Sequence, residues 1–481
     1  MLKSSAGKIS RVVQFAVLIF LSAQILIGCL WGFLNCTRLQ AFPDTAELVR
    51  LSGTLRLSNE TGILYPALLI VIRTLTVNGP VKFYWIMYLI QIVLALVAWF
   101  VFARNVFKFD SKYKDAFFAL AVVTNPFAMQ VHLAVLEYSF VSSFICLLVA
   151  YQIRFMREWK SVEKKPGLEK ALRDISVTSL FWLAASLSRK EFIVIGCIPV
   201  IFLTFAIVKR LLGSNVKKAL SIISPVILVL AFAGIICMTD SLFRSEERLS
   251  VTDSIKRELY YRVAWSENFS IPYRWPDYLT SFVDDGMMTH FMNDPGLIRE
   301  EFTDYVTEKL GSEETTEKFF EWAKISFAGN KKQIVKETIS DMAGYVFAPG
   351  KTEYILRGAE FPGFAAGNYD VMKQQNPKLT KLYLRGFSVG YGVMIAACII
   401  AMILEKISGG SEKKDSAGKR SSLSICSPVI LLIICTAVKY TFLGCNVYDH
   451  RKAVFVTCMW IVMLSVYALK VFDTKPVTED K

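Results

Sequence analysis

The sequence predicts an all-α polytopic membrane protein with about ten transmembrane helices. One reason is composition: the chain has 481 residues, of which 54% are hydrophobic, and its mean hydropathy is +0.42. A soluble protein has nowhere to bury so much apolar surface. The other reason is that apolar runs recur along the chain and are separated by basic segments. These runs lie near 12–34, 82–103, 116–131, 133–153, 175–188, 191–208, 219–239, 384–404, 424–443 and 453–470.

The distribution of charge predicts how these helices are oriented. The formal net charge is +14, but the segment from Asp240 to Tyr383 holds 18 Lys and Arg against 23 Asp and Glu. The rest of the chain holds 37 against 18, mostly in short connections between apolar runs. Such an excess is typical of cytoplasmic connections and does not indicate a nucleic-acid partner. We therefore expect a multi-pass protein of the plasma membrane, embedded in the lipid bilayer, with both termini in the cytoplasm.

The first outside loop carries an acidic motif. The first apolar run, 12–34, follows three basic residues, so the chain after it should lie outside. This loop contains Asp44 and Glu47, two carboxylates at spacing i, i+3 that share one face if the segment is helical. A carboxylate beside the membrane is suited to act as a base that deprotonates an acceptor. The alternative for Asp44 is a helix N-cap, and the alternative for Glu47 is a surface pair with Arg50.

The segment Ile63 to Val77 is apolar but too short to span a bilayer, and Arg73 interrupts it. Counting it as a span would invert every later loop and break the charge rule. We therefore interpret it as a re-entrant or interfacial helix on the outer surface. Tyr65 and Pro66 stand at its start, where a helix tolerates proline.

The long segment 240–383 is predicted to be an outside loop with several short amphipathic helices. Phe319, Trp322, Ala323 and Phe327 recur at helical spacing within it. Prolines interrupt the segment repeatedly, which argues against one continuous helix. The chain thus divides into a membrane module at 1–239, the extracytoplasmic loop at 240–383, and a C-terminal membrane module at 384–481 with a cytoplasmic tail.

Four short motifs follow one another on the predicted outside face. They are Pro43-Asp44-Thr45-Ala46-Glu47, Tyr65-Pro66, Asn125-Pro126-Phe127 with Glu137-Tyr138-Ser139, and Ser188-Arg189-Lys190-Glu191. In this order they resemble the glycosyltransferase C (GT-C) superfamily. The resemblance is to its polyprenyl-phosphate-sugar-dependent class, which includes protein mannosyltransferases and aminoarabinose transferases. It covers roughly Val12 to Thr239 and implies a conserved module of about seven spans followed by a variable one.

The resemblance implies a glycosyltransferase that takes a hexose or pentose from a polyprenyl-phosphate-linked sugar. The acceptor would be a glycan, lipid or protein of the cell envelope. By position the catalytic acid falls on Asp44, with Glu47 nearby, and a divalent cation such as Mg²⁺ or Mn²⁺ is an open question, as is any metal ligand. The remaining residues expected to bind the substrate are Tyr65, Glu137, Arg189, Lys190, His450 and Arg451.

Each of these residues also has a plainer interpretation. Arg189 and Lys190 are suited to clamp a phosphate, or they hold lipid headgroups at the interface. His450 and Arg451 are cations on a predicted outside loop, where Asp449 alternatively forms a surface pair with Arg451 or Lys452. Glu137 indicates function only if it lies inside a span.

Two other functions compete with glycosyl transfer. An envelope polysaccharide polymerase or ligase shares many spans and a long late outer loop. A transporter or flippase, which is not an enzyme, predicts ionisable residues deep within spans and helices broken at the midplane.

Overall fold

A computed structural model describes most of the predicted membrane helices. The residues described are 2–36, 48, 62–76, 80–161, 168–189, 192–195, 197–212, 218–243, 253, 256–257, 259–260, 302–347, 377–407 and 461–473. The chain forms two compact units, and each is presented by itself below. The first comprises Met1–Ser245, Pro349–Ile433 and His450–Lys481, and the second comprises Glu246–Ala348 and Ile434–Asp449.

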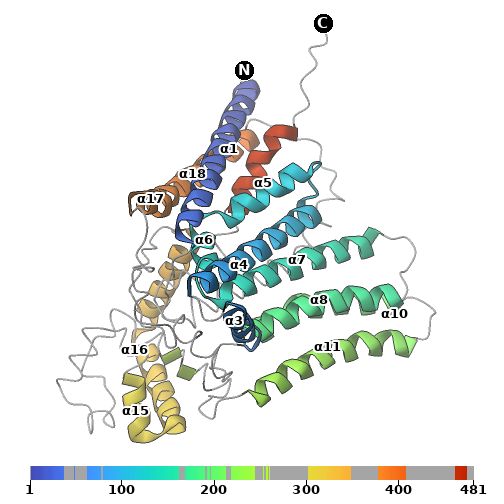
Figure 1. Ribbon diagram of the computed structural model, residues 1–481, viewed down its shortest axis with the longest axis vertical. Helices are drawn as coiled ribbons and strands as arrows, with labels where there is room; N and C mark the ends of the chain where they lie inside the picture. Colours follow the sequence, from blue (N-terminus) through green and yellow to red (C-terminus); the bar gives the residue numbers. More distant parts are fainter. Residues whose placement is uncertain are drawn as a thin grey trace, which may run out of the picture. The chain divides into compact units, whose positions relative to one another are not determined.

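The described residues are almost entirely helical and include no β-strand, which confirms the all-α class (Figure 1). Four of the helical stretches are long and apolar enough to cross a membrane. They are Lys8–Asn35, Lys82–Phe107, Glu137–Glu158 and Lys378–Leu404. The count of ten spans and a GT-C-like topology stay predictions, and the predicted span 424–443 lies outside the described residues.

The first two spans correspond to α1 (Leu2–Asn35) and α4 (Pro80–Phe102). A π-helical turn, η1 (Ala103–Phe107), follows α4, and Lys108 ends it in the left-handed conformation with φ 53°. Arg157 from a later helix donates to the carbonyls of Asn105 and Val106 at 3.0 and 2.8 Å. These bonds satisfy carbonyl groups that the wider turn exposes.

The predicted span 116–131 is not one helix. It is divided into α5 (Lys112–Val123) and α6 (Pro126–His132). Asn125 adopts an extended conformation, and its side chain accepts hydrogen bonds from the amides of Phe127 and Ala128 at 3.0 and 2.9 Å. Because a residue before proline avoids the helical region and asparagine caps a helix well, the Asn125-Pro126 pair ends one helix and starts the next.

The next four helices pack as antiparallel neighbours (Figure 1). They are α7 (Glu137–Ser161), α8 (Leu168–Ser188), α10 (Cys197–Leu212), which follows the short α9 (Phe192–Ile195), and α11 (Lys218–Leu242). A buried cluster that includes Val141, Leu148, Trp182 and Val200 joins α7, α8 and α10. The helix α7 also packs against α4, so it is enclosed on several sides.

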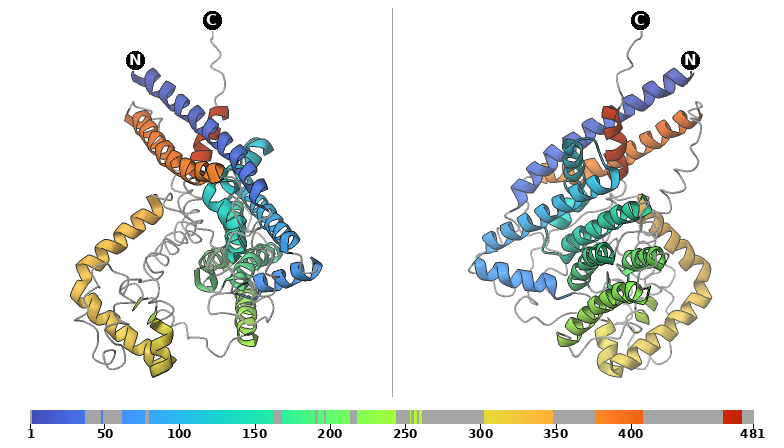
Figure 2. Two further views of the ribbon diagram at one scale, coloured as in Figure 1. Left: turned by 60° about the vertical axis from the view of Figure 1, so that its left-hand side comes forward. Right: turned by 90° about the vertical axis from the view of Figure 1, so that its right-hand side faces the viewer.

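The helix α18 (Phe387–Ile407) runs beside α1, as both views of Figure 2 show. It continues from α17 (Pro377–Lys381) through a π-helical turn, η6 (Leu382–Gly386). Gly390 lets the helices approach, because a Cβ there would lie 2.5 Å from the ring of Phe20. Phe20 also packs on Phe387 and Tyr391, with ring centroids 5.3 and 5.2 Å away. Residues 461–473 form a last helix that ends in η8 (Lys470–Asp473).

The short apolar segment after the first outside loop is a helix, α3 (Leu64–Leu75), as predicted. It has 12 residues, too few to cross a bilayer. Tyr65, Leu69 and Ile72 are buried in the main cluster, whereas Val71 and Leu75 are exposed. Its location at the outer membrane surface stays a prediction.

The second compact unit contains α15 (Thr303–Leu310) and α16 (Ser312–Phe347). The sequence predicted several short helices; α16 covers 36 residues and consists of two helices that meet in a kink at Asn330, where φ is −124°. Of the four residues predicted to form its apolar face, Phe319, Trp322 and Ala323 are buried, and Phe327 is partly buried. Tyr260 stacks on Phe319 with ring centroids 4.1 Å apart, which gives this unit a small aromatic core of its own.

Candidate functional site

Three of the predicted site residues lie in the described part of the chain, and the structure gathers them in one region. Tyr65 is on α3, Glu137 is the first residue of α7, and Arg189 directly follows α8. The other five lie outside the described residues and keep their predicted roles as predictions: Asp44, Glu47, Lys190, His450 and Arg451.

Glu137 and Arg189 form a buried ion pair. The helices α7 and α8 pack along each other in opposite directions, so the start of α7 lies beside the end of α8. The Nη1 atom of Arg189 donates to the Oε1 atom of Glu137, and the two side chains are only 2% and 1% exposed. Removing two charges from water is costly, so burial is tolerated only when the pair is well compensated.

Two further features of the structure compensate these charges. The guanidinium of Arg189 lies over the ring of Tyr138, with its central carbon 4.2 Å from the ring centroid. A cation over an aromatic face is attracted by the negative charge of that face. Glu137 occupies the first turn of α7, where the helix dipole favours a carboxylate.

Tyr65 lies within electrostatic reach of this pair. Burial raises the pKa of Tyr65 well above its usual value, and the charge of Glu137 raises that pKa further. The phenol is therefore neutral at physiological pH. The phenol donates a hydrogen bond to the Oε1 atom of Gln91 at 2.8 Å. The rings of Tyr65 and Phe140 pack edge to face, with their centroids 5.4 Å apart.

Gln91 connects three parts of the fold through one side chain. Its amide nitrogen donates to the carbonyls of His132 and Ala134 at 2.7 and 2.9 Å, while its amide oxygen accepts from Tyr65. Residues 133–136 form the connection that leads directly into Glu137, and all of them are buried. Gln91 on α4 thus fixes the position at which α7 begins.

His132 stabilises the same connection. Its Nδ1 atom lies 2.8 Å from the hydroxyl of Ser139. This hydrogen bond joins the end of α6 to the first turn of α7. His132 lies outside the four candidate spans, and burial lowers its pKa to about 4. The imidazole is therefore neutral at physiological pH and acts here as a structural hydrogen-bonding group.

Gly62 attaches the end of the first outside loop to this region. Its amide donates to the carbonyl of Ser188 at 3.1 Å, one residue before Arg189. A Cβ at this position would collide with the carbonyl of Leu187, so only glycine fits. Leu48, the residue after Glu47, is buried in the main cluster. The end of this loop, at Gly62, is therefore anchored next to Arg189.

Sequence reasoning singled out Glu137 and Arg189 but paired neither with the other, and it missed Gln91 and Gly62. Gln91 carries a usable signal, because it is a polar residue inside an apolar run. Gly62 carries a weaker one, since glycine is common in loops. Within the described ranges, no group of three or more His, Cys, Asp or Glu residues is arranged to hold a metal ion.

Comparison of the chain with known protein families, with curated proteins and with solved structures returns no match. The resemblance to the GT-C superfamily therefore depends on the sequence motifs alone.

Proposed function

We propose that this chain is an integral membrane glycosyltransferase. It moves a sugar from a polyprenyl-phosphate donor to a cell-envelope glycan, lipid or protein on the outer face of the membrane. The observation that supports this most is the buried pair of Glu137 and Arg189 at one end of the α7–α8 hairpin. Buried ionisable groups are costly, and for that reason they are candidates for a functional site.

Two further observations support this location. The segment between α7 and α8 contains Lys164 and Lys165, so it is expected in the cytoplasm, and the Glu137–Arg189 end is then outside. Gly62 binds Ser188, which places the end of the loop containing Asp44 beside Arg189. In this proposal the acidic loop and the buried guanidinium belong to the same end of the bundle.

In the proposed reaction, Asp44 takes the proton from the acceptor hydroxyl as its oxygen attacks the anomeric carbon of the sugar. The bond between that carbon and the phosphate oxygen breaks, and the polyprenyl phosphate leaves with the electron pair. Cations stabilise the charge on the leaving phosphate. The chain offers Arg189 and, by sequence, Lys190, His450 and Arg451 for that role, while Glu47 is the second carboxylate of the loop.

Arg189 is paired with Glu137 before any substrate arrives. A phosphate group that reaches this guanidinium competes with the carboxylate for it. Arginine presents five donors in a planar fork, so it is able to bind both anions at once. In this proposal Glu137 holds Arg189 in position and keeps the empty site electrically balanced.

A transporter or flippase is the second candidate, because the helix break at Asn125-Pro126 is a feature that such proteins use. Asp115 on α5 and Asp174 on α8 are also fully buried. We favour the enzyme because the Glu137–Arg189 pair lies at the ends of α7 and α8, whereas transporters place such groups near the middle of the membrane.

The test is transfer of labelled sugar from a panel of polyprenyl-phosphate donors in membranes that contain the wild type or Asp44→Asn at matched expression. Asp110→Asn serves as the matched control, because Asp110 is an exposed acid in the connection between η1 and α5. We expect transfer by the wild type and the control and none by Asp44→Asn. The acceptor panel includes glycan, lipid and protein fractions of the envelope.

Equal transfer by wild type and Asp44→Asn would remove Asp44 from the mechanism and leave Glu47 and Glu137 to be tested in the same way. Movement of the labelled carrier across the membrane, without transfer to any acceptor, would replace the proposal by the transporter.

A further inference from the structure

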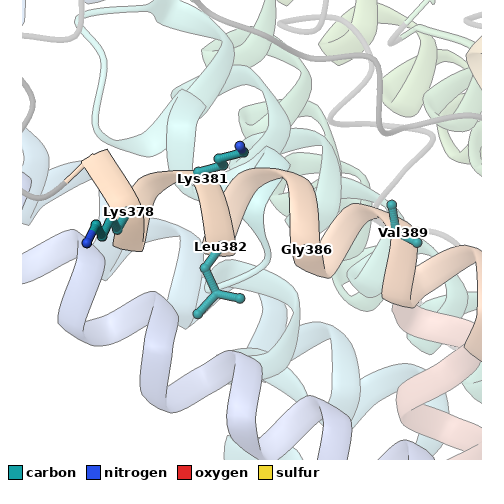
Figure 3. A pocket seen from close by; sticks show the side chains of 5 residues that line it. All are labelled: Lys378, Lys381, Leu382, Gly386 and Val389. Carbon is teal, nitrogen blue, oxygen red and sulfur yellow. The ribbon is translucent and has the colours of Figure 1, made fainter.

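A second positively charged region lies on the helix formed by α17, η6 and α18. Lys378, Lys381, Leu382, Gly386 and Val389 line a groove of about 600 Å³ on this helix, and Figure 3 shows them on successive turns. All five residues are exposed. Lys378, Leu382, Gly386 and Val389 follow one another at spacings of three or four residues, which brings their positions to one side of the helix. Lys381 extends from the opposite edge of the helix to Leu382, so these two side chains border the groove on either side (Figure 3).

The groove has a polar end and an apolar side. The two lysines stand where the apolar stretch begins, and Leu382 and Val389 follow toward its centre. Gly386 between them has no side chain to fill the space. Lysine near the end of a span extends its ammonium group to the headgroup region while its carbon stem covers apolar surface.

The nearest acidic residues in the sequence are Asp370 and Glu405. The sequence from Val371 to Leu404 contains no Asp or Glu, and Lys373 and Arg385 add to the positive charge. In the predicted orientation, the Lys378 end of this span lies outside. The positive-inside rule places basic residues preferentially on the cytoplasmic side, so it does not account for the lysines here. The lysines therefore have a reason to be there other than membrane orientation.

We infer that this groove is a binding site for one anionic phospholipid of the bilayer. Lys378 and Lys381 contact the headgroup phosphate, and an acyl chain lies along Leu382, Gly386 and Val389. Two cations one helical turn apart suit an anionic headgroup, and an open groove along an exposed apolar helix suits an acyl chain. None of its lining residues is among those proposed for sugar transfer, and the inference does not depend on that proposal.

The experiment uses the full chain in detergent, titrated with short-chain phosphatidylglycerol, phosphatidylcholine or polyprenyl phosphate, with bound lipid counted by native mass spectrometry. We expect phosphatidylglycerol to bind most tightly. The variant Lys378→Gln/Lys381→Gln should weaken that binding about tenfold or more. Gly386→Leu should weaken it without any change of charge, because the new side chain occupies the groove.

The matched control is Lys8→Gln/Arg11→Gln, which removes two exposed cations at the same spacing from the end of α1. It should leave phosphatidylglycerol binding unchanged. An equal loss in the control would mean that net charge alone attracts the lipid, and equal binding of phosphatidylcholine would mean that the groove does not select anions. Tighter binding of polyprenyl phosphate than of phosphatidylglycerol would assign the groove to the carrier lipid. Each of these results overturns the inference.

Discussion

The helices α7 and α18 are both apolar enough to cross a membrane, yet they differ in what surrounds them. Most of α7 is buried by its neighbours, and it carries Glu137, Ser139 and Gln152 on buried positions. By contrast, α18 exposes apolar side chains such as Val389, Val393 and Ile403. The buried polar groups are found on α7, which other helices surround, whereas α18 presents apolar side chains of the kind that contact lipid. The chemistry of this chain should therefore depend on α7 far more than on α18.

The largest effect should come from breaking the ion pair at the start of α7. Arg189→Gln leaves the Glu137 carboxylate buried without its cation, which should lower the free energy of unfolding by about 4 kcal/mol. The double variant Glu137→Gln/Arg189→Gln should lose less than the single variant, because it leaves no unpaired charge. Unfolding by SDS in mixed micelles measures both. Equal losses in the single and double variants would show that the two charges are not coupled.

The next largest effect concerns the hydrogen bonds that locate α7. Gln91→Leu leaves the carbonyls of His132 and Ala134 and the hydroxyl of Tyr65 without this partner. The loss in the free energy of unfolding should be roughly 3 kcal/mol. Gln14 on α1, also buried, provides the matched control as Gln14→Leu. If Gln91→Leu proves as stable as the wild type in the same micelle assay, Gln91 does not hold the connection before α7.

A dependence on pH should come from His132. Its pKa is lowered to about 4 in the folded chain, against about 6.5 in an unfolded one. Between these pH values the unfolded chain binds more protons, so stability is complete above about pH 6.5 and falls as the pH drops toward 4. The loss should reach at most about 3 kcal/mol. His132→Asn keeps a polar group near Ser139 without a titrating ring, so its unfolding free energy should vary less over this range.

The smallest effects test the comparison of the two helices directly. Val141 on α7 is fully buried, and Val393 on α18 is 58% exposed. Val141→Ala should cost about 2 kcal/mol because it removes two buried methyl groups and leaves a cavity. Val393→Ala should cost less than about 0.5 kcal/mol. Similar costs for the two would mean that α18 is enclosed to the same degree as α7.

Hydropathy and charge predicted the helical class and most positions of the described helices, because burial in lipid imposes a long apolar run on each one. They did not predict the break at Asn125-Pro126, since an apolar average is insensitive to one capping residue. The Asn-Pro pair itself carries that information in its local chemistry.

The residues of the candidate site were easier to predict from the sequence than the contacts between them. Glu137 and Arg189 are 52 residues apart in sequence, and their pairing depends on how α7 and α8 align. Gln91 was missed because a hydropathy average conceals one amide among apolar neighbours. Nothing in a single sequence says which distant carbonyl groups such an amide will bind.

The three bonds of Gln91 restrict which amino acids fit at that position. Glutamate lacks the two donors, lysine lacks the acceptor, and asparagine is one methylene shorter. Of the twenty genetically encoded side chains, only glutamine offers this combination at this length. A library that randomises position 91 and is selected for a folded protein should thus return glutamine almost alone, unless the partners on α3 and before α7 are randomised with it.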